Sequence, residues 1–227
     1  RATRTDLLRW RGRLGIAARA PVVAAPIGTT LAAPDPGALP AQLDLNHPLF
    51  VALGTIEPRK NHAVLLDAWE ELARRGGPVP QLVIAGRRGW KNHATFARLD
   101  ALPPGGPVLE LNGLSDGAVA ALLEHSRALL MPSRAEGFGL PLTEAAGRGI
   151  PVLSTPLPAA GEILGDHALW LPHDDPRAWA DAVAGLAAQP PRRLPPLAVP
   201  MWCDHLAAAF RAIGGIPAPL PAPGQEG

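Results

Sequence analysis

The pattern of apolar and polar residues changes from residue 49 onward. Short runs of consecutive apolar residues alternate with longer stretches in which apolar residues recur at helical spacing. This alternation is typical of a parallel sheet whose strands are buried on both faces and joined by crossover helices. The predicted strands are 49–53, 81–85, 108–111, 128–131, 151–154 and 168–171. The pattern predicts an α/β fold, a Rossmann-like doubly wound parallel sheet.

The helices are predicted from apolar stripes and from the signals at helix ends. The first, residues 61–75, carries Val64 and Leu65 on its apolar stripe, and a Gly-Gly-Pro sequence ends it. Ser115 or Asp116 is the predicted N-cap of a later helix. Further helices are predicted to begin near 92 and at 141, and to cover 176–188 and 202–213.

The two ends of the chain fall outside this alternation. Residues 5–14 predict a basic helix and residues 22–25 a short strand, while the proline-rich stretch 190–200 interrupts the chain before its last helix. The final glycine- and proline-rich tail is expected to be disordered. The predicted organisation is 1–40, the end of a preceding domain and a linker; 41–190, one Rossmann-like domain; 191–214, a linker and terminal helix; and 215–227, the tail.

Composition restricts the class of protein. With 47% hydrophobic and 18% charged residues among 227, the chain has enough apolar material for a folded core. A formal net charge of +1 gives no field that would attract nucleic acid. The single cysteine, Cys203, excludes an internal disulfide, and no apolar run reaches the roughly 18 residues that cross a bilayer. We therefore expect a cytoplasmic protein without a nucleic-acid partner.

The segment 132–151 carries the most informative motif, a strand end followed by a glycine-rich loop and a helix. Gly137 and Gly139 allow the backbone to approach a ligand closely, and free amides at a helix start attract phosphate. Glu136 and Glu144 flank this loop eight positions apart. Carboxylates accept hydrogen bonds from sugar and ribose hydroxyls, so the motif predicts a site for an elongated, partly anionic ligand.

Two further strand ends carry candidate groups. Gly54 and Thr55 open a loop in which Arg59 and Lys60 directly precede a helix, and together the two cations would clamp a diphosphate. A cation at the start of a helix is unfavourable unless an anion is bound there. The run 82–90 also ends a strand, and ligands of open parallel sheets bind at that end of the strands.

In these motifs the chain resembles the retaining GT-B glycosyltransferases of group 1, also called family 4, and within them the C-terminal donor-binding domain. Glu136 and Glu144 match the family's pattern of two glutamates separated by seven residues, and the likeness extends in order over residues 49–188. The resemblance implies transfer of a sugar from a GDP- or UDP-linked donor with retention of configuration. It implies no further cofactor and no metal ion.

The same resemblance implies a partner domain and a setting. Family members carry an N-terminal acceptor-binding domain, whose last helix and strand resemble residues 5–25, and which would receive a glycan or lipid-linked acceptor. The Glu-Pro-Arg-Lys-Asn and Gly-Trp sequences resemble bacterial enzymes that build surface polysaccharide, often from mannose-type donors. The expected place is the cytoplasm, including the cytoplasmic face of the membrane.

The resemblance also assigns roles to the residues of the 132–151 motif. In the family the second glutamate binds the ribose hydroxyls, which implies this role for Glu144. The first glutamate contacts the donor sugar, which implies that role for Glu136. The loop amides bind phosphate and sugar, and here these belong to Phe138, Gly139 and Leu140.

Roles outside that motif follow in the same way. Lys60 corresponds to the family's diphosphate-binding lysine. Many members have an arginine directly after the loop glycine, where this chain has Thr55, and Arg59 is the candidate replacement. Backbone near Arg87 and Leu114 is implied to contact the base. The residues expected to act in catalysis are Glu136, Lys60 and Arg59.

Simpler interpretations exist for several of these residues. Glu144 alone would complement a helix dipole, and Arg87 and Arg88 would be solvated. Tryptophans, Trp90 among them, are more often packing than recognition residues. The histidines, including His62, show no ligand spacing and are expected to be solvated or satisfied structural side chains. The basic N-terminal helix would present a solvated face, or at most a peripheral contact with an anionic membrane.

The sequence lacks the motifs of two other nucleotide-binding classes. A nicotinamide-dependent dehydrogenase needs Gly-x-Gly-x-x-Gly after the first strand, and a P-loop nucleotidase needs Gly-Lys-Ser or Gly-Lys-Thr. The first pattern is absent at that place and neither lysine follows a glycine. The alternative that remains is a catalytically inactive donor-domain remnant that binds nucleotide or a partner protein.

Overall fold

A computed structural model of the chain describes residues 1–17 and 21–214. The chain divides into two compact units, one formed by Arg1–Thr30 with Pro200–Gly227 and the other by Leu31–Val199. The tail predicted at 215–227 lies outside the described residues. Every candidate site residue lies in the second unit.

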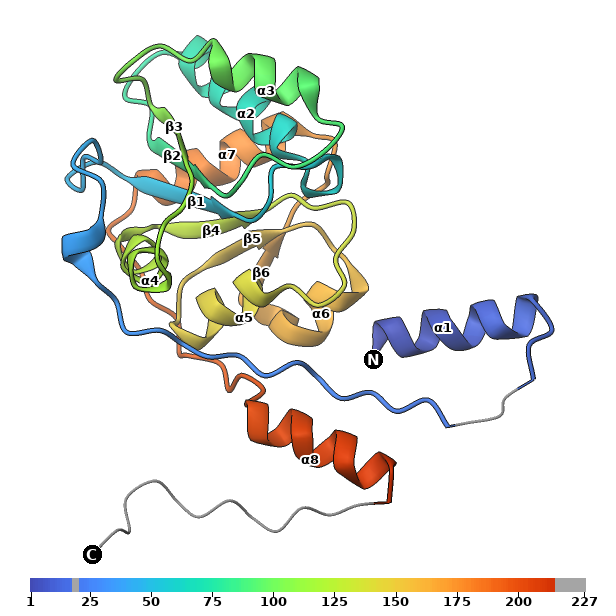
Figure 1. The fold of residues 1–227 in the computed structure, drawn as a ribbon. Coiled ribbons are helices and arrows are strands. Elements are labelled where there is room, and N and C mark those ends of the chain that lie inside the picture. The colour runs from blue at the N-terminus through green and yellow to red at the C-terminus, as the bar shows by residue number, and fades with distance from the viewer. Residues whose placement is uncertain (18–20, 215–227) are drawn as a thin grey trace, which may run out of the picture. The chain divides into compact units, whose positions relative to one another are not determined.

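The second unit is built on a parallel sheet that, within the described residues, has six strands in the order β3-β2-β1-β4-β5-β6 (Figure 1). This is the strand order of a doubly wound fold, and the predicted fold class is confirmed. The order reverses between β1 and β4, which are neighbours in the sheet. The strands are β1 (Leu49–Leu53), β2 (Gln81–Ala85), β3 (Val108–Leu111), β4 (Ala128–Met131), β5 (Val152–Ser154) and β6 (Ala168–Trp170).

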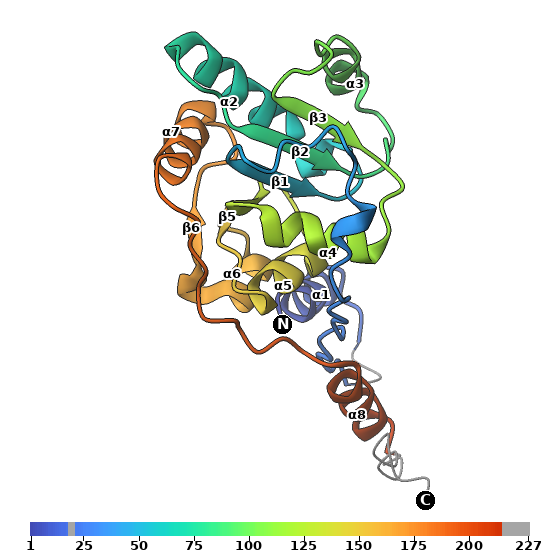
Figure 2. The ribbon, with the colours of Figure 1, turned by 90° about the vertical axis from the view of Figure 1, so that its left-hand side faces the viewer.

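Helices cover both faces of this sheet, as two views at right angles show (Figures 1 and 2). One face is covered by α2 (His62–Arg75), α3 (His93–Asp100) and α7 (Pro176–Ala187), and the other by α4 (Asp116–His125), α5 (Leu140–Gly147) and α6 (Pro158–Leu164).

Strand β1 is buried on both of its faces, which explains why its sequence is apolar throughout. Phe50 and Ala52 point to the core shared with α2 and α7, whereas Leu49, Val51 and Leu53 point to the core shared with α4 and α5. Successive side chains of a strand alternate between faces, so a sheet covered on both sides has no polar face. Polar chemistry is thereby confined to the ends of the strands.

Local signals place the helix ends close to where the sequence predicts them. The stripe of α2 is buried at Val64 and Leu65. The Ser115 hydroxyl accepts a hydrogen bond from the Ala118 amide at 3.1 Å and caps α4, while the Asp175 carboxylate caps α7. These caps satisfy amides that have no partner inside the helix.

Two elements differ from the expectation. The strand predicted at 22–25 is wrong: residues 21–30 have no regular structure, because the described part of their unit contains no strand with which they could pair. Helix α6 was not predicted from the sequence, because its seven residues from Pro158 onward are too few to show helical periodicity. Short 3-10 turns lie at Pro36–Ala38 (η1), Pro58–Lys60 (η2) and Gly165–His167 (η3).

The unit formed by the chain ends contains α1 (Ala2–Arg13) and α8 (Trp202–Ala212). Neither helix has a buried residue. The Thr29 amide donates to the Pro200 carbonyl at 2.8 Å, which joins the segment before the sheet domain to the start of α8.

The cap of α4 gives a test of the fold. We expect Ser115→Ala to lower the free energy of unfolding by about 1 kcal/mol, because the Ala118 amide loses its acceptor. Ser115→Asp, which supplies another acceptor, should retain most of the stability. Urea denaturation measures both, and equal stability of Ser115→Ala and the unchanged protein would contradict the role of this cap.

Candidate functional site

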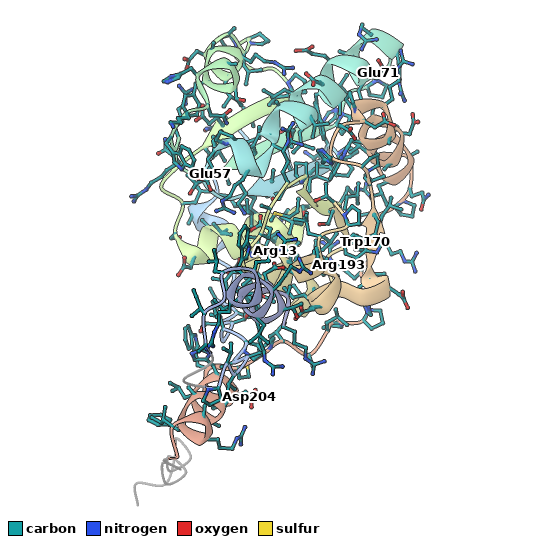
Figure 3. All side chains as sticks on the ribbon, turned by 90° about the vertical axis from the view of Figure 1, so that its right-hand side faces the viewer. Arg13, Glu57, Glu71, Trp170, Arg193 and Asp204 are labelled. Carbon is teal, nitrogen blue, oxygen red and sulfur yellow. The ribbon has the colours of Figure 1, made fainter. Side chains whose placement is uncertain are left out.

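Two loops meet where the strand order reverses, at the carboxyl ends of β1 and β4. The first runs from Gly54 through η2 to the start of α2, and the second from Pro132 to the start of α5. The Arg134 amide donates to the Arg59 carbonyl at 2.7 Å, which joins the two loops directly. Figure 3 views the protein from the side toward which the strands run. In doubly wound sheets this reversal point is where ligands bind.

An ion-pair cluster brings together the three residues expected to act in catalysis. The Lys60 ammonium lies 2.7 Å from one oxygen of Glu136, and the Arg59 guanidinium lies 3.2 Å from the other. The Ser133 hydroxyl donates to Glu136 at 2.6 Å. Lys60 and Glu136 keep only 8% and 6% of their side-chain exposure, so water screens this pair weakly.

The cluster continues through Glu57, which sequence reasoning did not single out. One Glu57 oxygen lies 2.7 Å from the Arg59 guanidinium, and the other accepts a hydrogen bond from the Trp90 indole at 2.8 Å. Glu57 is labelled in Figure 3. Trp90 is 60% exposed, so its interpretation as a packing residue is wrong. The sequence signal for Glu57 was its place at the start of the Glu-Pro-Arg-Lys-Asn sequence, two positions before Arg59.

The backbone around Lys60 is fixed by two unusual residues. Gly54 has φ 125°, and a β-carbon there would lie 3.2 Å from Cε of Lys60. Asn61 has left-handed dihedral angles, φ 55° and ψ 37°, and its buried amide donates to the carbonyls of Pro132 at 3.1 Å and His173 at 2.7 Å. Asn61 therefore ties the first loop to the ends of two other strands.

The glycine-rich loop enters α5 as the motif predicts. Gly139 is the N-cap with φ 94°, a conformation that favours glycine, and no side chain caps the helix start. Phe138 is half-buried and Leu140 is 41% exposed. A β-carbon at Gly137 would meet no atom within 4 Å. The first amides of α5 are thus uncapped by any side chain and suited to an anion.

Glu144 lies one turn further along α5 and differs from Glu136 in having no ionic or hydrogen-bonding partner among the described residues. Its side chain is half-buried. Burial raises the pKa of the Glu144 carboxyl, and Asp116 adds to this effect while Arg148 opposes it. Because no protein donor occupies it, this carboxylate can accept hydrogen bonds from a ligand's hydroxyls.

The remaining predicted residues lie around the cluster without joining it. Thr55 and Arg87 are exposed, and the Arg87 carbonyl accepts from the Ile56 amide at 2.8 Å. Leu114 is half-buried against the core beneath α4 and α5. The structure therefore brings Arg87 next to the first loop through its backbone.

Arg88, expected to be solvated, instead forms ion pairs with Glu110 and Asp100, both at 2.6 Å. These pairs hold the loop after β2 against β3 and α3. That loop carries Trp90, so its fixed backbone helps to place the indole beside Glu57.

His62 contradicts its interpretation as a solvated or satisfied histidine. It is 2% exposed, and within the described part of the chain its Nδ1 has no hydrogen-bond partner. Burial, with the nearby Lys60 charge, lowers the pKa of His62 to about 4. The imidazole is therefore neutral at pH 7 and adds no second positive charge beside Lys60.

The described residues contain neither a candidate metal-binding cluster nor a candidate membrane-spanning helix. Among residues 1–17 and 21–214, no cluster of three or more His, Cys, Asp or Glu side chains is arranged to hold a metal ion. None of the helices in the same ranges has the length and apolar character needed to span a bilayer.

Comparison with known proteins identifies the family. Residues 40–194 match the sequence profile of the family described as glycosyl transferases group 1. The chain belongs to this family. The group 1 match covers every residue of the ion-pair cluster and of the glycine-rich loop, and it confirms the resemblance inferred from the two-glutamate motif.

Two individual relatives of this group 1 domain are both named as mannosyltransferases. The serotype-specific mannosyltransferase WbdA of Escherichia coli is 40% identical over 137 residues, which cover 60% of this chain and 17% of that protein. The O-antigen chain mannosyltransferase B of Escherichia coli is 32% identical over 117 residues, covering 52% of this chain and 31% of that protein. The matched region is thus less than a third of either relative.

A solved structure supports the fold. Sucrose-phosphate synthase from Thermosynechococcus elongatus superimposes with a TM-score of 0.61 at 24% identity, over 79% of this chain and 47% of that one. At this identity the likeness concerns the fold, and it agrees with the doubly wound sheet of the group 1 domain.

The raised pKa of Glu144 predicts a pH-dependent change in stability. A carboxyl whose pKa is higher in the folded state stabilises the fold below its ordinary pKa of 4.5, and this contribution is lost as pH rises through the folded value. We expect Glu144→Gln to unfold at a higher temperature than the unchanged protein at pH 7. The difference should vanish near pH 4, and a Glu144→Gln protein that is less stable at pH 7 would contradict this assignment.

The lowered pKa of His62 predicts the opposite pH dependence. Its contribution to stability is complete above pH 6.5 and is lost as pH falls toward about 4. At ~1.4 kcal/mol for each pH unit, the loss reaches about 3 kcal/mol. Urea denaturation from pH 4 to 7 should show a flatter profile for His62→Leu, whereas His173→Leu, at an exposed position, should keep the original slope. An unchanged slope in His62→Leu would count against a buried neutral imidazole.

Proposed function

We propose that the chain is the donor-binding domain of a glycosyltransferase. The enzyme transfers a sugar from a nucleoside diphosphate sugar to a glycan or lipid-linked acceptor, with retention of anomeric configuration. The observation that carries this proposal is the buried Lys60 ammonium at the reversal point between β1 and β4, next to the uncapped start of α5.

The charge arrangement supports a diphosphate at this place. Lys60 lies two residues before α2, where the helix dipole makes a cation unfavourable without an anion, and in this structure the Glu136 carboxylate occupies the place of that anion. Lys60 and Arg59 supply two positive charges from one loop, and the first amides of α5 approach from the other. These groups stabilise the negative charge that develops on the departing diphosphate, which is the main demand of glycosyl transfer from such a donor.

Each of the two glutamates binds a different uncharged part of the donor. Glu144, which has no salt bridge or hydrogen bond from another side chain in the described structure, accepts hydrogen bonds from the ribose hydroxyls. Glu136, at the other end of the loop, accepts those of the donor sugar. In this proposal the carboxylates bind the donor, and the cations and amides carry the charge of the leaving group without a metal ion.

The relatives suggest the biological setting. The names of both relatives describe mannosyltransferases, and one of them is named for the O-antigen chain. We therefore propose a mannose-type donor linked to GDP, with UDP as the other base to test, and a role in bacterial surface-polysaccharide synthesis at the cytoplasmic face of the membrane. The acceptor would be bound by a second domain, as in the family resemblance.

Calorimetric titration with GDP, UDP, GDP-mannose and UDP-glucose tests the donor site. We expect one diphosphate to bind in the micromolar range, and we expect Lys60→Met and Glu144→Ala to weaken that binding by about tenfold or more, since each removes a charged hydrogen-bond partner. Arg74→Ala removes an exposed arginine at the far end of α2 and should leave the binding constant unchanged.

Thermal unfolding of each variant separates lost binding from lost folding. Failure of the folded, unchanged protein to bind any of the four ligands would contradict the proposal and would favour a domain that has lost donor binding. Equal losses in Arg74→Ala and Lys60→Met would show that general charge, and not the buried ammonium, attracts the nucleotide.

A further inference from the structure

The proposed diphosphate-binding lysine already holds an anion. The Lys60 ammonium and the Glu136 carboxylate are 2.7 Å apart, and both side chains are more than nine-tenths buried. Glu136 is further held by Arg59 at 3.2 Å and by the Ser133 hydroxyl at 2.6 Å. Both of its oxygens therefore have donors.

A diphosphate that binds Lys60 meets this carboxylate. If Glu136 stayed in place, the phosphate oxygens would lie next to a buried negative charge, and like charges in a poorly solvated site repel strongly. If Glu136 simply left, it would become a buried carboxylate with fewer donors, which is also costly. Binding is therefore strongest when the carboxylate leaves Lys60 and finds new donors.

We propose that Glu136 is an internal counter-ion of Lys60, which the donor's diphosphate displaces, and that the displaced carboxylate then takes the hydroxyls of the donor sugar. This inference rests on the proposed function. An intact sugar nucleotide supplies both the anion for Lys60 and the hydroxyls for Glu136. A nucleoside diphosphate supplies only the anion, so the site discriminates between the donor and the nucleotide that remains after transfer.

The surrounding contacts allow this exchange without movement of the loops. Arg59 keeps Glu57 as its partner at 2.7 Å when Glu136 turns away. Asn61 holds the first loop to the ends of β4 and β6 through two hydrogen bonds. In this proposal Glu136 alone changes partners, and after transfer it returns to Lys60 as the nucleotide departs.

The test compares binding of a nucleoside diphosphate and its sugar conjugate to four proteins: the unchanged chain, Glu136→Gln, Lys60→Met and the double variant. With the base identified by titration, we expect Glu136→Gln to bind the nucleoside diphosphate about tenfold tighter, because the competing carboxylate is gone. Its preference for the sugar nucleotide over the nucleoside diphosphate should shrink by about the same factor. In the Lys60→Met background, Glu136→Gln should bring no gain.

Two further variants keep the result interpretable. Asp181→Asn removes a carboxylate on α7 that is ion-paired with Arg75 at the far end of α2, away from the cluster, and it should change neither affinity. Ser133→Ala removes one neutral donor from Glu136 and should tighten binding of the nucleoside diphosphate roughly threefold. If Glu136→Gln does not fold, the Ser133→Ala variant provides the test in its place.

The outcomes separate this inference from the proposed function. If the unchanged protein binds neither ligand, the proposed function fails and the inference fails with it. If the unchanged protein binds, Lys60→Met weakens binding, and both Glu136→Gln and Ser133→Ala bind the nucleoside diphosphate no more tightly than before, then the donor site stands and the counter-ion exchange is overturned.

Discussion

The burial of both faces of a parallel sheet is the constraint on which the rest of the structure depends. Strand β1 has no polar side because α2 and α7 cover one face and α4 and α5 the other. Charged side chains therefore have to lie at the ends of the strands. The reversal of strand order between β1 and β4 places two loops side by side at one such end, and the ion-pair cluster forms there.

Charge balance then organises the site. Two cations from one loop are matched by Glu57 and Glu136, so the cluster is internally neutral without a ligand. The buried His62 imidazole is neutral at pH 7 and adds no positive charge beside Lys60. Glu144 differs because nothing in the described chain donates to it, and burial raises its pKa. One carboxylate is thus held by donors of the protein, and the other has no such donor in the described chain.

The sequence predicted the sheet well because its signals are local. Each strand is a short apolar run, and caps such as Ser115 and Asp175 mark where helices begin. The strand predicted at 22–25 failed because an apolar run forms a strand only when a partner strand is available. Helix α6 was missed because seven residues are too few for a periodicity to be recognised.

The sequence predicted which residues belong to the site, but it did not predict which of them contact one another. Lys60 and Glu136 were each chosen from their own motif, yet their ion pair joins positions 76 residues apart and depends on the neighbouring placement of β1 and β4. The bond between Glu57 and Trp90 likewise follows from the bridge that pairs Ile56 with Arg88, which no sequence pattern displays. The roles assigned to Arg87, Leu114 and the loop amides stay predictions until a ligand is seen.

A crystal structure of the protein bound to its nucleoside diphosphate tests the central claim most directly. The account predicts the diphosphate within hydrogen-bond distance of the Lys60 ammonium and of the first amides of α5, with the Glu136 carboxylate turned away from Lys60. A diphosphate bound elsewhere, with the pair between Lys60 and Glu136 intact, would contradict it.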